Sequence, residues 1–172
     1  MSFLVVVIPA VNGVIRASDE YDFQPVVGFP QVPENITLNY CSGVTVNSKG
    51  YVYLAHRGQR PIICFDATGH YIRSWGDELL GSAHALRIDS DDNVWVTDIK
   101  RHLVLKFTST GKLLRSIGRP DSAGLGNDQA DVAFGTEGAI YVADGYGNSR
   151  VMKFNANGKF LTSWGTPGGG SG

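Results

Sequence analysis

Residues 43–76 read GVTVNSKGYVYLAHRGQRPIICFDATGHYIRSWG, residues 85–118 read ALRIDSDDNVWVTDIKRHLVLKFTSTGKLLRSIG, and residues 131–165 read DVAFGTEGAIYVADGYGNSRVMKFNANGKFLTSWG. The three stretches align on one phenylalanine, Phe65, Phe107 and Phe154, which recurs after 42 and then 47 residues. A repeat of about 40–50 residues is typical of the blades of a β-propeller. The repeat therefore predicts three consecutive blades.

Each repeat contains four short segments that are rich in β-branched and aromatic residues, as strands are. In the first repeat, the first and second of these segments are joined by the turn residues Asn47-Ser-Lys-Gly50. The third and fourth are joined by Ala67-Thr-Gly69. A glycine at such a position supplies the positive φ that a tight hairpin needs. No segment shows a 3.6-residue apolar period over the length of a helix. We therefore expect an all-β fold of four-stranded antiparallel blades.

The repeat divides the chain of 172 residues into segments. We expect a leader at 1–20 that is either a signal peptide or disordered, a lead-in segment at 21–42, and a Gly-rich linker end at 166–172. A blade is apolar on both faces, and propellers close into rings of about 4–8 blades. We therefore expect half of a six-bladed ring, with missing blades or a partner covering the open blade edge.

Composition excludes some functions and favours others. The 15 Lys+Arg nearly balance the 16 Asp+Glu, whereas a dedicated nucleic-acid binder needs an excess of basic residues. The apolar N-terminal stretch 3–11 is too short to span a bilayer, so we expect no membrane partner. Asn35-Ile36-Thr37 is a glycosylation sequon and favours an extracellular or secretory location. The two cysteines, Cys41 and Cys64, are interpreted as buried free thiols, with a single disulfide as the alternative.

Propeller topology predicts which residues share a face. The loop leading into the first strand of a blade and the loop from its second to its third strand lie on the same side of the ring. His84, Arg57, Tyr146 and Asp144 fall in such loops, so we expect all four to project from one face near the central channel. Taken alone, each has an ordinary structural explanation, such as a surface imidazole or a turn-capping carboxylate.

Short sequence motifs around these residues resemble those of the peptidyl-α-hydroxyglycine α-amidating lyases, a branch of the NHL-repeat propellers. The residues that carry the resemblance are His56-Arg57-Gly58, His84-Ala-Leu-Arg-Ile-Asp89, Val94-Trp-Val-Thr-Asp98 and Asp144-Gly-Tyr-Gly-Asn-Ser-Arg150. The resemblance spans nearly all of residues 40–165. It implies that the whole protein is a six-bladed ring. It also implies a lyase activity that cleaves a C-terminally hydroxyglycine-extended peptide to a peptide amide and glyoxylate.

The resemblance also implies roles for individual residues. His84 matches the first of three histidines that hold an axial zinc ion, and Arg57 matches an arginine that binds the substrate. Tyr146 matches a tyrosine proposed as the general base, which needs a nearby cation to lower its pKa. The backbone carbonyls of Val44 and Leu86 match positions that bind a structural calcium ion.

The sequence also departs from the family pattern. The other two zinc histidines would fall in blades four and six, so the zinc site is incomplete in this chain. Ala83 and Ala85 replace the proline and glycine that usually flank the first histidine, and Gly147 replaces a loop cysteine. We therefore expect the chain to be inactive alone. The alternative function is a non-catalytic NHL-repeat propeller that serves as an interaction platform for a protein or ligand.

Overall fold

The computed structural model describes residues 24–118, 129–145 and 148–168, and it contains three four-stranded antiparallel sheets. The expected leader, Tyr146 and the last four residues lie outside the described residues. The strands are β1 (Cys41–Val46), β2 (Val52–His56), β3 (Ile62–Phe65), β4 (Tyr71–Trp75), β5 (Ala83–Ile88), β6 (Val94–Asp98), β7 (Leu103–Phe107), β8 (Leu113–Ile117), β9 (Gln129–Phe134), β10 (Ile140–Asp144), β11 (Arg150–Phe154) and β12 (Phe160–Trp164).

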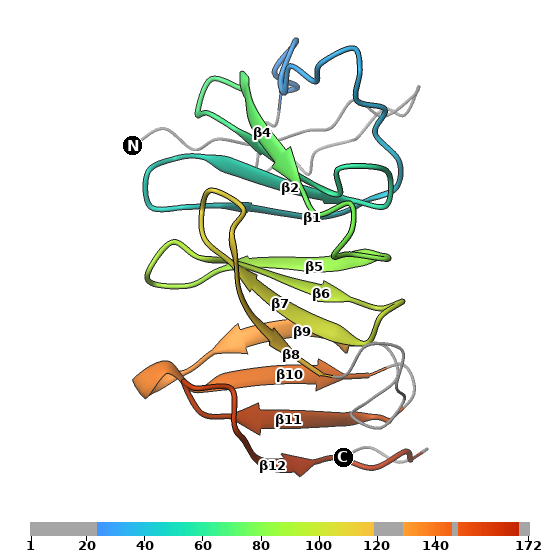
Figure 1. The fold of residues 1–172 in the computed structure, drawn as a ribbon, viewed down its shortest axis with the longest axis vertical. Coiled ribbons are helices and arrows are strands. Elements are labelled where there is room, and N and C mark those ends of the chain that lie inside the picture. The colour runs from blue at the N-terminus through green and yellow to red at the C-terminus, as the bar shows by residue number, and fades with distance from the viewer. Residues whose placement is uncertain (1–23, 119–128, 146–147, 169–172) are drawn as a thin grey trace.

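Each sheet is a simple meander in which consecutive strands pair, in the orders β1 to β4, β5 to β8 and β9 to β12. Figure 1 shows the three sheets stacked face to face along the long axis of the molecule. We call them blades 1, 2 and 3. The only helical turn among the described residues is a 3₁₀ turn at Thr136–Gly138, between β9 and β10. The all-β prediction and the three-bladed propeller architecture are confirmed.

The hairpin turns share one pattern of side-chain hydrogen bonds. The Oδ1 atom of Asn47 accepts the amide protons of Lys49 and Tyr51, at 3.1 Å and 2.9 Å. Short polar side chains bond their own following amides in this way, which favours a turn over a continued strand. The pattern recurs at Asp66, Asp89, Thr108 and Asn155. These residues therefore set where most of the hairpins turn.

The core is divided between the blade interfaces. The forward face of blade 1, including Tyr53 and Ile62, packs against blade 2 residues such as Leu86 and Phe107. The forward face of blade 2 packs against blade 3 in the same way. The innermost strands approach closely, because a Cβ atom added to Gly43 would lie 3.0 Å from the Cβ atom of Leu86. Glycine at position 43 thus lets β1 lie directly against β5.

The lead-in segment covers the other face of blade 1. Phe29 and Ile36 are buried against Val52 and Phe65. Phe29 lies over Gly69 so closely that an added Cβ atom would come within 2.5 Å of its ring. Trp75 lies over Gly111 in the same way, at 2.8 Å. Phe29 therefore takes the place that the last strand of a preceding blade would take.

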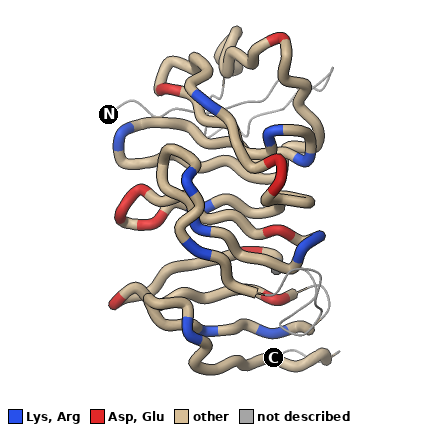
Figure 2. The backbone as a smooth tube through the Cα atoms, viewed as in Figure 1, with Lys and Arg blue, Asp and Glu red and all other residues tan. Residues whose placement is uncertain are grey.

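The forward face of blade 3 remains open to solvent. Trp164 matches Trp75 in the repeat, yet its side chain is 50% exposed, with Phe160 and Leu161 similarly exposed. Trp75 and Trp95 pack between blades. Acidic and basic residues are interspersed along the backbone in Figure 2, with no single-sign stripe across the described part of the chain.

Candidate functional site

A β-bulge at the start of the first strand positions His84. Ala83 pairs with Asp98 and Leu86 pairs with Val96, so His84 and Ala85 together face Thr97 alone. Blades 1 and 3 have a register shift at the matching place, which leaves Ser42 and Ala130 as the matching bulge residues. Bulges re-aim side chains and are frequent beside functional sites. His84 is the titratable residue among these three positions.

Arg57 and His84 meet across the boundary between blades 1 and 2. The Nη2 atom of Arg57 lies 3.2 Å from Nδ1 of His84. A guanidinium group has only donors, so Nδ1 accepts and carries no proton in this pairing. Arg57 is exposed and directly follows β2, and its backbone amide donates to the carbonyl of Tyr40 at 3.1 Å. The structure thus brings together two of the residues that the sequence predicted to share a face.

His56 fixes the loop that carries Arg57, a role that the sequence did not predict. Its imidazole is fully buried at the end of β2. Nδ1 accepts the backbone amides of Asn39 and Gly58, each at 3.2 Å, and Nε2 donates to the carbonyl of Arg60 at 3.1 Å. Burial lowers the pKa of His56, which keeps the ring neutral and Nδ1 free to accept. His56 therefore ties the lead-in segment to both ends of the loop.

Asp98 has the same role in blade 2 as His56 has in blade 1: its buried side chain binds backbone groups of the neighbouring loops. It is fully buried, and its carboxylate accepts the amides of Gly81 and Ser82 in the incoming loop and of Lys100 and Arg101 in the following loop. The alignment of the repeats could have indicated this loop-fixing role. His56, Asp98 and Asp144 occupy the same place at the end of the second strand of their blades.

Asp144 does not project from the channel face, and the expectation that it would was wrong. Its side chain is fully buried, and Oδ2 accepts Nε of Arg150 at 2.8 Å and Nδ2 of Asn148 at 3.0 Å. The carboxylate is buried because it pairs with Arg150 and so avoids the cost of an isolated charge. The two ends of the Asp-Gly-Tyr-Gly-Asn-Ser-Arg string are thereby joined. Tyr146, between them, lies outside the described residues.

One of the two carbonyls implied as calcium ligands, that of Leu86, already accepts a hydrogen bond from a guanidinium group. Nη1 of Arg87 donates to the carbonyl oxygen of Leu86 at 3.1 Å, and Nη2 pairs with Asp131 at 2.5 Å. Val44 lies on the neighbouring strand β1, with its side chain exposed. A cation bound to the Leu86 carbonyl would lie beside this guanidinium, and like charges repel. As arranged, these residues do not fit a calcium ion.

The described residues also do not form a zinc site. In 24–118, 129–145 and 148–168, no group of three His, Cys, Asp or Glu side chains could hold a metal ion. Structural and catalytic zinc sites need at least three protein ligands, and His84 supplies one. The described part of the chain has no helix of the length and apolarity that crossing a bilayer requires.

The cysteines do not form a disulfide. Cys64 is buried in the core between blades 1 and 2, as expected, and burial raises the pKa of its thiol. Cys41 is exposed at the start of β1, so the expectation that it is buried was wrong.

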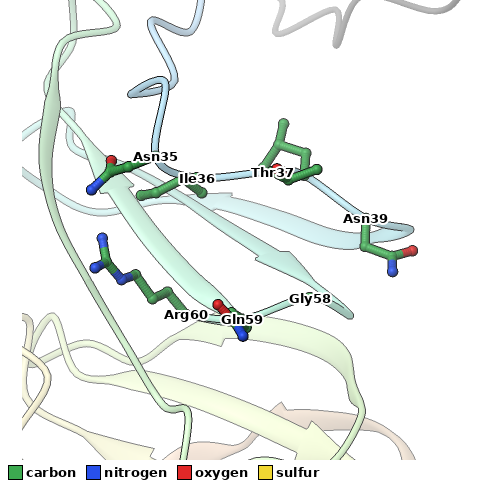
Figure 3. Close-up of a pocket in the computed structure, with 8 residues that line it drawn as sticks. Asn35, Ile36, Thr37, Asn39, Gly58, Gln59 and Arg60 are labelled. Carbon is green, nitrogen blue, oxygen red and sulfur yellow. The ribbon is translucent and has the colours of Figure 1, made fainter.

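A pocket of about 310 Å³ lies beside the β2–β3 loop that carries Arg57. The lead-in segment forms one wall and the β2–β3 loop forms the other. Figure 3 shows the side chains of Asn35 and Arg60 pointing toward one another across it. The pocket is lined by Asn35, Ile36, Thr37, Leu38, Asn39, Gly58, Gln59 and Arg60. The sequon residue Asn35 is exposed at its rim.

Comparison with known proteins gives relatives in sequence and in structure. No protein-family model matches the chain. The chain is 36% identical over 126 residues to peptidyl-alpha-hydroxyglycine alpha-amidating lyase 2 of Drosophila melanogaster, covering 68% of this chain and 31% of the relative. It is 31% identical over 198 residues to peptidylglycine alpha-amidating monooxygenase of Rattus norvegicus, covering 95% of this chain and 19% of the relative.

Two further matches bear on the fold and on the alternative function. NHL repeat-containing protein 3 of Homo sapiens is 30% identical over 157 residues, covering 80% of this chain and 44% of the relative. The solved structure of a streptogramin B lyase superimposes with a TM-score of 0.65 at 18% identity, covering 78% of this chain and 43% of that chain. At that identity the likeness shows the fold alone. The chain thus spans less than half the length of these relatives.

Proposed function

Because the chain is a homologue of the peptidyl-α-hydroxyglycine α-amidating lyases, we propose that it contributes the substrate-binding arginine of such a lyase. The proposed reaction cleaves the C–N bond of a peptidyl-α-hydroxyglycine and releases a peptide amide and glyoxylate. The observation that carries the proposal is the contact between Arg57 and His84 across the first blade boundary. Both residues belong to the strings that the chain shares with the lyase family.

Arg57 is the residue that binds the substrate carboxylate in this proposal. Its guanidinium is exposed, and a planar fork of donors matches the two oxygens of a carboxylate. His56 positions Arg57 by holding Gly58 and Arg60, the residues that follow it. A loop fixed in this way loses less conformational freedom when the ligand binds.

Tyr146 is the proposed general base, and this role rests on the sequence string around it. Removing the proton of the substrate hydroxyl at neutral pH requires a tyrosine pKa below its usual value near 10, which a nearby cation would provide. A zinc ion would supply that positive charge, and His84 is its proposed ligand in this chain. Nδ1 of His84 is taken up by Arg57 and the proton of the neutral ring lies on Nε2, so His84 would have to give up this contact to bind the metal. The remaining ligands would have to come from residues other than the described ones, so we derive no catalytic step through the metal.

The test is glyoxylate release from a synthetic peptidyl-α-hydroxyglycine by the protein as its source cell produces it. Arg57→Ala and Tyr146→Phe should each lower kcat/KM by about 10²-fold or more, which is typical for the loss of one stabilising group. Lys49→Ala is the matched control, because Lys49 is an exposed cation in the β1–β2 hairpin. Rates that match the unaltered protein for both variants would remove these roles.

The alternative is a non-catalytic propeller that binds a protein or ligand on the same face. The match to human NHL repeat-containing protein 3, which covers 80% of this chain, supports this alternative. Measuring glyoxylate release distinguishes the two functions. An interaction platform releases no glyoxylate at any enzyme concentration, whereas a lyase releases it in proportion to enzyme.

A further inference from the structure

The pocket between the lead-in segment and the β2–β3 loop contains a guanidinium group that has no hydrogen-bond or ion-pair partner in the part of the chain that the structure describes. Arg60 uses its backbone amide to donate to Asp77 and its carbonyl to accept from His56. Its side chain makes no hydrogen bond or ion pair with any described residue, and it extends toward Asn35 in Figure 3. The cation is therefore available to a ligand that enters the pocket.

The backbone of Arg60 is held in a conformation that its residue type disfavours. Its φ is 54°, in the left-handed region, and the residue precedes Pro61, which further restricts it to extended conformations. Such a conformation costs on the order of 1–3 kcal/mol and persists only where the surroundings fix it. Here the bonds to Asp77 and His56 fix it. Glycine would adopt this φ without strain, so an arginine at this position indicates a use for its side chain.

The other polar groups around the pocket suit a carboxylate. Asn35 and Gln59 can each donate from an amide, and Thr37 can donate from a hydroxyl. The volume of about 310 Å³ is at the lower end of the range of small-ligand pockets. Ile36 and Leu38 add apolar surface for the methylene groups of an acidic side chain.

One loop thus presents two guanidinium groups in two directions. Arg57 reaches His84 in blade 2, and Arg60 reaches into the pocket under the lead-in segment. We propose that the pocket binds the carboxylate of an acidic side chain in a peptide whose C-terminal end lies at Arg57. The peptide nature of the ligand rests on the proposed lyase function. The pocket would make the site select peptides with Asp or Glu upstream of their C-terminus.

The experiment measures binding and not turnover, so its failure is distinct from failure of the lyase proposal. Peptides ending in glycine, each with one Glu or Gln at a position two to five residues before the end, are titrated into the 172-residue chain by calorimetry. We expect one Glu peptide to bind about tenfold more tightly than its Gln twin. Equal affinity for every Glu and Gln pair would overturn the proposal.

Two variants assign the preference to the pocket. Arg60→Gly removes the guanidinium and relieves the backbone strain, and Asn35→Asp places a carboxylate opposite Arg60 with almost no change in size. Each should abolish the preference for Glu, while Lys49→Gln should retain it. A preference that survives in both variants contradicts the proposal. Free glutarate is titrated in the same way to distinguish a peptide from a small acid. If it binds as tightly as the best Glu peptide, the ligand is a small free acid, and the peptide assignment is wrong.

Discussion

Arg57 and His84 belong to different blades, and Nη2 of the first lies 3.2 Å from Nδ1 of the second. The contact depends on two local devices. A β-bulge in β5 sets the position of His84, and the buried imidazole of His56 fixes the loop of Arg57. Because the two residues come from separate sheets, the contact also requires that blades 1 and 2 stack in register. The site is therefore sensitive to packing as well as to its own side chains.

Replacing His56 by alanine should destabilise the protein markedly. The variant leaves the amides of Asn39 and Gly58 and the carbonyl of Arg60 without their partner in a part-buried region. An unsatisfied buried group costs about 1–3 kcal/mol, so we expect a loss of about 2–4 kcal/mol in the free energy of unfolding. Urea denaturation measures it. His70→Ala is the control, because His70 is exposed; equal effects of the two substitutions would contradict the role of His56.

Stability should fall as the pH drops below about 6.5, the ordinary pKa of histidine. Burial lowers the pKa of His56 in the folded protein, so the unfolded chain takes up its proton first. Between the two pKa values the unfolded state binds more protons, and the free energy of unfolding decreases by up to about 1.4 kcal/mol per pH unit. Above the unfolded pKa this contribution is fully present. Unfolding in urea at pH 7.5, 6.5 and 5.5 measures the slope.

The variant His56→Ala separates this contribution from those of other groups. It should unfold with a shallower dependence on pH over the same range than the unaltered protein. The same slope in both proteins would show that another titratable group dominates.

The sequence predicted the blades because their signals are local and repeated. The hairpin residues Asn47 and Asp89 and the shared phenylalanines identify strands and turns without any tertiary information. It also predicted that Arg57 and His84 share a face, since topology alone decides which loops adjoin. It could not predict that Asp144 is buried or that His56 accepts two amides, because both depend on which groups lie opposite after folding. The available clue to both was that His56, Asp98 and Asp144 occupy the same position in the repeat, at the end of the second strand of each blade.

Calcium should leave the thermal stability of this chain unchanged. The carbonyl of Leu86 already accepts a hydrogen bond from Arg87, whose guanidinium also pairs with Asp131. A bound divalent cation would have to displace this cationic group. We expect the same Tm in CaCl₂ and in EDTA, measured by calorimetry at constant ionic strength. Arg87→Ser is the informative variant, since it removes the competing charge. A Tm several degrees higher in CaCl₂ for the unaltered chain would contradict the prediction.

Trp164 should behave differently from Trp75, although the two occupy the same place in the repeat. Trp75 lies over Gly111 of the next blade and contacts Tyr53 and Phe107 edge-on, so Trp75→Ala should cost about 3–5 kcal/mol. Trp164 makes the matching contact with Tyr141 but is 50% exposed, and its replacement should cost about 1 kcal/mol in the 172-residue chain.

The difference arises from the missing cover on blade 3, and we expect a further blade to provide that cover. The forward faces of blades 1 and 2 are each buried by the apolar back face of the next blade, which fixes the chemistry of the cover. Hydroxyl-radical footprinting should oxidise Trp164 readily in the 172-residue chain and protect it in the protein isolated from its source. Trp75 is the internal control, protected in both. Equal oxidation of Trp164 in the two preparations would show that this face stays open.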